Sequence, residues 1–98
     1  MDSLTGKQKR RLKSLAHHLK PVVYVGKNGM TESLVAAVDK ALADHELVKI
    51  RFVDFKDEKP DLMERICAAT GADIIGLIGN NAILFRRNRD AAKQKIVL

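Results

Sequence analysis

The apolar residues of this chain recur at two different spacings, and the change of spacing separates helices from strands. In the first twenty residues they follow the i, i+3, i+4, i+7 spacing of one helical face, at Leu12, Leu15, Ala16 and Leu19. Thr5 and Gln8 have the spacing of a capping box at the start of this helix, and Lys20-Pro21 ends it. The pattern predicts an amphipathic first helix whose opposite face carries most of the charges.

Short apolar runs predict four strands, at residues 22–25, 47–55, 73–78 and 82–87. A second helix should begin after the cap Thr31, and a third should run from Lys59 to a C-terminal cap at Gly71. Their inward residues are expected to be Leu34, Val35, Val38, Ala41 and Leu42 in the second helix, and Leu62, Met63, Ile66 and Ala69 in the third.

Connections between these elements predict the sheet. Strands separated by helices imply parallel crossovers, whereas the turn signal Gly79-Asn80-Asn81 makes the last two strands antiparallel. The predicted fold class is α/β: one compact domain, with a mixed four-stranded sheet and three helices in the order α-β-α-β-α-β-β. Residues 1–87 form this domain, and residues 88–98 are expected to be a basic C-terminal tail.

Charge indicates the class of partner. The chain has 98 residues, 46% of them apolar, with a net charge of +6 and a pI near 9.7, which favours nucleic acid. Residues 1–27 hold seven Lys and Arg and only one acid, and residues 71–98 hold five bases and two acids. The middle segment is mildly acidic. This distribution predicts one positive face.

Several other classes have no support in the sequence. No apolar stretch approaches the roughly 20 residues of a membrane span, and the charged N-terminus is unlike a secretory signal. The single cysteine, Cys67, fits a reducing compartment, so we expect a cytoplasmic location. Adjacent histidines on a helix diverge by 100°, so His17 and His18 are not expected to bind a metal. We expect no cofactor and no enzymatic activity, because no nucleophile motif, Walker loop or dinucleotide fingerprint is present.

The segment Gly26-Lys27-Asn28-Gly29 is the strongest candidate for a functional site. It follows the short strand at 22–25 and opens onto the helix capped by Thr31. Such a turn is expected to leave backbone N–H groups unpaired at the positive end of a helix, and its glycines let a bulky anion come close. Lys27 adds a full charge. The turn could also be purely structural, but its chemistry suits a phosphodiester backbone.

Four segments in order resemble one known family. They are LTGKQKRRLKSLAHHLKP in the first helix, VGKNGMTESL at the loop, DHELVKIRF before the second strand, and ATGADIIGLIGNNAILFR in the closing hairpin. Over Leu4 to Arg87 the chain resembles the stand-alone bacterial form of the CRM domain (chloroplast RNA splicing and ribosome maturation), the YhbY type. The segment from Val53 to Lys59 and the tail depart from that pattern.

The resemblance implies an RNA-binding fold related to the C-terminal domain of translation initiation factor three. It also implies association with precursors of the large ribosomal subunit. The family's GxxG loop falls on residues 26–29, and its basic first helix on Lys7, Lys9, Arg10, Arg11 and Lys13.

Together these arguments predict a monomeric RNA-binding protein that acts on ribosomal RNA in pre-ribosomal particles. The predicted RNA-binding residues are Gly26, Lys27, Asn28, Gly29, Thr31, Lys7, Arg10, Arg11, Lys13, His17, Lys20, Arg86 and Arg87. With only Tyr24, Phe52, Phe55 and Phe85 as aromatics, the chain lacks the stacking platform of an RRM, so backbone and shape recognition is expected. The alternatives are a protein-docking assembly module whose charge gives only non-specific attraction and, with little motif support, a duplex-DNA binder.

Overall fold

The computed structural model describes residues 4–53, 59–96 and 98. Their order is α1 (Gly6–Ala16), β1 (Val23–Val25), α2 (Glu32–His45), β2 (Leu47–Phe52), α3 (Lys59–Thr70), β3 (Asp73–Ile78), β4 (Asn81–Phe85) and a short 3₁₀ turn, η1 (Ala91–Lys93). This confirms the predicted order of helices and strands. The predicted end of the second strand at Phe55, and most of the segment from Val53 to Lys59, lie outside the described residues.

The four strands form one mixed sheet in the order β1-β2-β4-β3. β1 and β2 are parallel, and β4 lies between β2 and β3, antiparallel to both. The connection through α3 therefore makes β3 parallel to β2, with β4 between the two strands. The predicted mixed sheet and its closing hairpin are confirmed. β1 and β3 are the edge strands.

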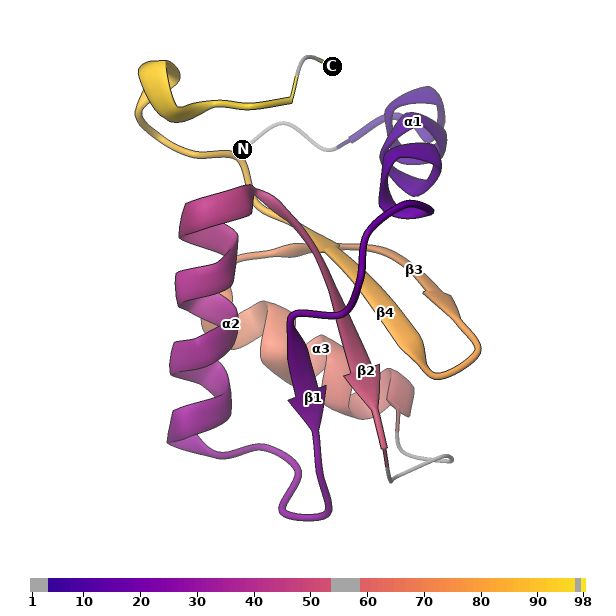
Figure 1. Ribbon diagram of the computed structural model, residues 1–98, viewed down its shortest axis with the longest axis vertical. Coiled ribbons are helices and arrows are strands. Elements are labelled where there is room, and N and C mark those ends of the chain that lie inside the picture. The colour runs from indigo at the N-terminus through magenta and orange to yellow at the C-terminus, as the bar shows by residue number, and fades with distance from the viewer. Residues whose placement is uncertain (1–3, 54–58, 97) are drawn as a thin grey trace.

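Helices cover both faces of the sheet (Figure 1). α2 and α3 pack on one face, where residues such as Val38 and Ile66 meet Val25, Ile50 and Leu84 from the strands. On the other face, α1 places Leu12 and Ala16 against a smaller cluster on β2, β3 and β4. The chain thus has two apolar cores separated by the sheet. None of its described helices has both the length and the apolar character needed to cross a membrane.

Local sequence signals set the helix ends. The Thr5 side chain accepts from the N–H of Gln8, and the Gln8 side chain accepts from the N–H of Thr5, which confirms the capping box. Thr31 caps α2 by accepting from the N–H of Leu34. Gly71 follows α3 with φ +74, and its N–H donates to the carbonyl oxygen of Cys67. Residues with a Cβ rarely adopt such a φ.

Five of the residues predicted to point inward are exposed or only half-buried. Leu15 and Leu19 are 37% and 38% exposed, because they line an open hollow beside β2 and do not pack fully against the sheet. Val35 and Ala41 are only half-buried, and Ala69 is exposed. In α3 the predicted Leu62, Met63 and Ile66 are buried, together with Cys67 and Thr70 in place of Ala69, so the buried face is rotated slightly from the predicted one.

The segment expected to be a tail lies against the domain. The Glu46 carboxylate accepts hydrogen bonds from the backbone N–H groups of Asn88 and Lys95. Ile96 and Leu98 pack against the core under α1. Glu46 is 1% exposed, directly follows α2 and has φ +61. A buried carboxylate needs hydrogen-bond donors, and here two backbone N–H groups of the last residues provide them.

Candidate nucleic-acid interface

The loop from Gly26 to Gly29 is a tight turn between β1 and α2. The Gly29 N–H donates to the Gly26 carbonyl oxygen at 3.0 Å, and Gly29 has φ +61, a conformation that favours glycine. Lys27 and Asn28 occupy the exposed corners of the turn. At Gly26, an added Cβ would meet no protein atom within 4 Å. Gly29 is therefore required by the turn, whereas no steric contact inside the described protein requires Gly26.

Some of the backbone donors expected to be free are used inside the protein. The Gly29 N–H closes the turn, and the Leu34 N–H is capped by the Thr31 hydroxyl at 3.0 Å. Within the described part of the chain, the N–H groups of Lys27 and Asn28 have no hydrogen-bond partner. The same holds for the first residues of α2, because a helix leaves its first N–H groups without an intrahelical acceptor. The available donors lie at the tip of the turn and the start of α2.

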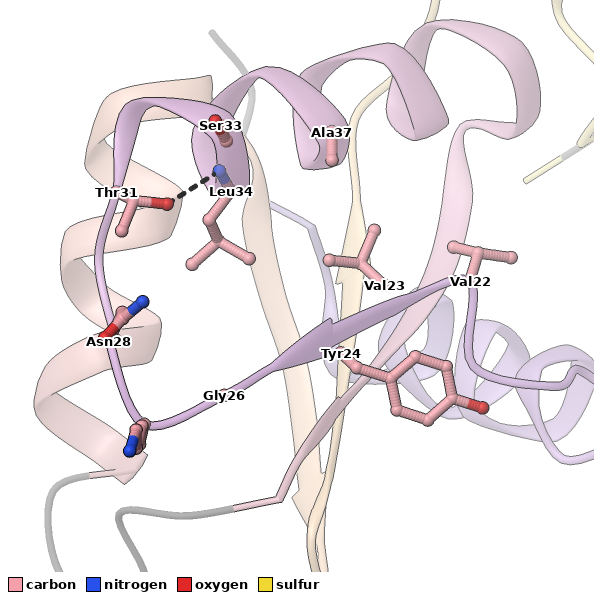
Figure 2. A pocket seen from close by; sticks show the side chains of 11 residues that line it. Val22, Val23, Tyr24, Gly26, Asn28, Thr31, Ser33, Leu34 and Ala37 are labelled. Atoms are coloured by element: carbon pink, nitrogen blue, oxygen red, sulfur yellow. Dashed lines mark hydrogen bonds between the residues drawn. The ribbon is translucent and has the colours of Figure 1, made fainter.

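A hollow of about 460 Å³ adjoins this loop. Figure 2 shows it between β1, the loop and the start of α2, with the hydrogen bond from Leu34 to Thr31 along one side. Val23 points from β1 towards α2, whereas the Tyr24 ring is directed to the other side of the strand, away from Ala37. The hollow combines backbone N–H groups with the positive N-terminus of a 14-residue helix.

The predicted basic residues of α1 are all at the surface. Lys7, Arg10, Arg11 and Lys13 are exposed, while Leu12 and Ala16 on the opposite face are buried. The Lys13 side chain lies across Gly76 of β3, where an added Cβ would come within 2.9 Å of its Cε. Lys13 is thus held over the sheet. His17 caps the C-terminal end of α1 through its N–H, and Lys20 is exposed just before β1.

Arg86 and Arg87 have partners inside the protein. The Arg86 guanidinium donates to the Asp39 carboxylate, the Asp39 carbonyl oxygen and the Thr70 carbonyl oxygen. These contacts join the end of β4 to α2 and α3. Arg87 donates to the Gln94 side chain at 3.3 Å. The Arg86 contacts account for this residue structurally, without an RNA ligand.

The structure separates the two halves of the predicted site. The molecule is 36 Å long, with α1 at one end of the long axis and the loop between β1 and α2 at the other (Figure 1). The segment after β4, which carries Arg87, lies at the same end as α1. The loop and the basic residues of α1 therefore form two groups at opposite ends, and Lys20 lies in the segment that joins α1 to β1.

Sequence reasoning missed the residues that lie between these groups. Tyr24 is 59% exposed, and Arg51 stands opposite it on β2. The alternation in Val23-Tyr24-Val25, with valines in the core, was a signal that the tyrosine would point outward. Glu46 was also missed, because its burial depends on residues more than forty positions later in the chain.

No metal or reactive thiol is evident among the described residues. They contain no cluster of three or more His, Cys, Asp or Glu side chains that could hold an ion. The rings of His17 and His18 touch edge to face, with centroids 5.5 Å apart. Burial, with a smaller contribution from the negative charge of Asp73, raises the pKa of the Cys67 thiol from 9.0 to about 11. Cys67 is therefore a packing residue of the core, and it stays protonated at neutral pH.

Comparison with known proteins bears directly on this fold. The chain is 40% identical over 87 residues to a probable RNA-binding protein of Pseudomonas aeruginosa, covering 88% of this chain and 84% of that one. It is 34% identical over 88 residues to the probable RNA-binding protein YqeI of Bacillus subtilis, covering 89% and 92%. The solution structure of a Staphylococcus aureus protein, described as a candidate RNA-binding protein, matches the fold of this chain with a TM-score of 0.80 at 33% sequence identity. That match covers 97% of this chain and all of the other.

A family model also matches this chain over most of its length. The model of the CRS1/YhbY (CRM) domain matches residues 4–86, which include α1, the loop and the whole sheet. This range agrees with the resemblance that the four sequence segments indicated. By sequence and by fold, this chain belongs to the CRS1/YhbY (CRM) domain family.

Proposed function

We propose that this protein binds RNA, with the loop at residues 26–29 as its main phosphate contact. The observation that carries this proposal is the turn itself. It exposes Lys27 and Asn28, leaves their N–H groups without a partner among the described residues, and adjoins the positive end of α2. Gly26 supports the same conclusion, since no atom of the described residues lies within 4 Å of the position its Cβ would take, and close approach of a ligand backbone explains a glycine there.

The basic face of α1 is proposed as a second contact. Lys7, Arg10 and Lys13 add positive charge at the far end of the molecule, where α1 has no acidic residue in its first turn. Relatives in Pseudomonas aeruginosa, Haemophilus influenzae and Bacillus subtilis carry names that describe them as RNA-binding. Since phosphate contacts supply most sequence-independent affinity, a monomer with two basic ends suits a long or folded RNA.

We further propose that the RNA is ribosomal, in cytoplasmic precursors of the large subunit, where the protein acts as a non-catalytic assembly factor. The support for this finer statement is the family, of which ribosome maturation is part of the name. Crosslinking in the host followed by sequencing tests it. Reads concentrated on one region of large-subunit precursor RNA are expected, and reads scattered over many RNAs would contradict an assembly role.

The loop contact is tested by the double variant Lys27→Asp with Asn28→Asp. RNA affinity should fall by at least tenfold with little change in thermal stability, because both side chains are exposed. A matched control is Arg65→Asp with Lys40→Gln, which changes the net charge equally on the outer faces of α3 and α2. Equal loss of affinity in both variants would mean that only overall charge matters, and equal loss of stability and affinity in the loop variant would make the loop structural.

One observation favours the alternative of protein docking. A hollow beside α1 is lined mainly by apolar side chains, among them Leu15, Leu19, Val22 and Ile96. Partly exposed leucines of this kind are common where proteins meet. Binding of the isolated protein to purified large-subunit RNA, without any ribosomal protein, separates the two functions: docking alone predicts no saturable binding there.

A further inference from the structure

A row of four side chains crosses one end of the sheet. In register across β1, β2, β4 and β3, it consists of Tyr24, Arg51, Asn81 and Ile78. Their neighbours along the strands, such as Val25, Ile50 and Ala82, are buried under α2 and α3. Because side chains alternate along a strand, the row lies on the opposite face of the sheet, the face on which α1 packs.

α1 leaves this end of the face open. Its buried residues contact the other end, where Leu47, Ile83 and Phe85 lie, and it packs on β2, β3 and β4. Tyr24 and Ile78, at the two edges of the row, are 59% and 60% exposed. An aromatic side chain with more than half of its surface in water contributes little burial energy to the fold, so the ring is available to a ligand.

The surroundings of Tyr24 are basic. Arg51 stands directly opposite on β2, Lys49 occupies the same face two residues earlier, and Lys20 precedes β1. Among the described residues, none of these three side chains has an ion-pair or hydrogen-bond partner. An exposed ring beside unpaired cations is the combination that holds single-stranded nucleic acid, in which the ring stacks on a base and the cations neutralise phosphates.

The position of the ring also matters. Val22, the residue before β1, lines both the hollow at the loop and the hollow beside α1, so both hollows reach the chain next to Tyr24. β1 lies between the loop and the chain segment that leads back to α1, so an RNA strand that follows this side of the molecule would pass Tyr24 (Figure 1).

We propose that Tyr24 and Arg51 form a subsite for one unpaired nucleobase of single-stranded RNA. The Tyr24 ring stacks on the base, and Arg51 and Lys49 contact the phosphates on either side of it. This inference rests on the proposed function and adds a base contact to a surface otherwise expected to read only the backbone. One ring provides stacking for one base, so the subsite tolerates different bases because all of them have a π-face. An apolar protein segment would leave the three cations without a counterpart, and so it fits less well.

The chain contains a built-in probe for this subsite. Tyr24 is its only tyrosine and it has no tryptophan, so tyrosine emission reports on this ring alone. The protein is titrated at low salt with a fluorescein-labelled oligoadenylate and with an abasic ribose-phosphate oligomer of the same length. Binding is followed by anisotropy and stacking by quenching of the tyrosine emission. Both oligomers are expected to bind, but only the oligoadenylate should quench.

Variants at position 24 test whether the aromatic ring itself is needed for binding. Tyr24→Phe should keep the affinity for oligoadenylate, whereas Tyr24→Val, which retains a strand-forming apolar residue, should weaken it about tenfold. Ile78→Ala, at the opposite edge of the same row, is the matched control and should change nothing. The affinity for the abasic oligomer should be the same in all four proteins.

The outcomes distinguish this subsite from the proposed function. If the oligoadenylate binds without quenching, or Tyr24→Val binds as tightly as Ile78→Ala, the base subsite is wrong while RNA binding stands. Equal quenching by the abasic oligomer would likewise overturn stacking. If neither oligomer binds the unaltered protein, both proposals fail together.

Discussion

Glu46 accepts a hydrogen bond from the backbone N–H of Lys95 at 2.6 Å, across 49 positions of the chain. The same carboxylate accepts from the N–H of Asn88 at 2.7 Å. Two backbone groups of the C-terminal segment thus have a buried anion as their acceptor, which joins this segment to the end of α2. The strained φ of Glu46 indicates that these bonds hold the backbone in place.

Removal of this carboxylate should release the C-terminal segment. Glu46→Ala is expected to lower the free energy of unfolding by about 1–3 kcal/mol, because two N–H groups lose a charged acceptor. Glu46→Gly loses the same acceptor without the cost of a Cβ at positive φ, so it should be more stable than Glu46→Ala. Urea denaturation measures stability, and amide exchange at Lys95 reports the release. Unchanged protection at Lys95 in both variants would contradict this role.

Substitution of Arg86 should lower the stability of the protein, whereas substitution of Arg87 should hardly change it. Arg86→Gln removes the contacts to Asp39 and Thr70 and should cost about 1–3 kcal/mol of stability, because the part-buried Thr70 carbonyl oxygen loses its donor and the Asp39 carboxylate loses its cation. Arg87→Gln removes one exposed contact and should cost less than about 0.5 kcal/mol. Thermal denaturation of the two variants decides. If both leave stability unchanged, the Arg86 contacts are not structural, and an RNA role for Arg86 gains support.

The cap of α2 should contribute measurably to stability. Thr31→Ala removes the acceptor for the Leu34 N–H and is expected to cost about 1 kcal/mol. Thr31→Ser keeps the hydroxyl and should be close to the unaltered protein. The comparison is made by urea denaturation. A loss of RNA affinity in Thr31→Ser, with stability retained, would point to a contact made by the threonine methyl group.

Lys13 should contribute to the salt dependence of RNA binding. Each phosphate contact to a single strand adds about −0.7 to the slope of log affinity against log salt concentration. Lys13→Gln is expected to make the slope shallower by roughly this amount. Lys40→Gln is the control, since Lys40 lies on α2 beside Asp44 and outside the proposed path. Identical slopes for the two variants would exclude a phosphate contact from Lys13.

Cys67 should make the protein less stable in alkaline solution. Burial, and to a lesser extent Asp73, raises the pKa of its thiol from 9.0 to about 11, so between these values the folded state binds more protons than the unfolded state. Stability is therefore fully present below about pH 9 and falls towards pH 11, by about 2–3 kcal/mol in all. Cys67→Ala should remove this part of the pH dependence, as measured by denaturation at pH 8 and pH 10.5. Parallel profiles would contradict it.

Much of the fold was predictable because its signals are local. The capping box at Thr5, the cap at Thr31, the glycine after α3 and the hairpin between β3 and β4 each depend on residues within four positions of one another. Backbone hydrogen bonding and positive φ at these sites have the same requirements in any fold. The loop at residues 26–29 is of the same kind, since strand, turn and helix follow one another in sequence.

Errors arose where burial depends on distant segments. Leu15 and Leu19 continue a helical stripe in the sequence, but in the structure they line an open hollow beside β2 and stay more than one-third exposed. Glu46 resembles a surface residue by type, and it is buried only because residues 88 and 95 return to it. Periodicity measures which residues share a face and does not measure what covers that face.

The sequence by itself therefore determined the elements, their caps, the exposed turn and the family, because these depend on short-range chemistry and residue order. Only the tertiary structure decided how the basic groups are arranged. It places the loop and α1 at opposite ends of the molecule and Tyr24 between them on an open part of the sheet. The reason is that distances between segments follow from how helices pack on a twisted sheet, a relationship that no local pattern contains.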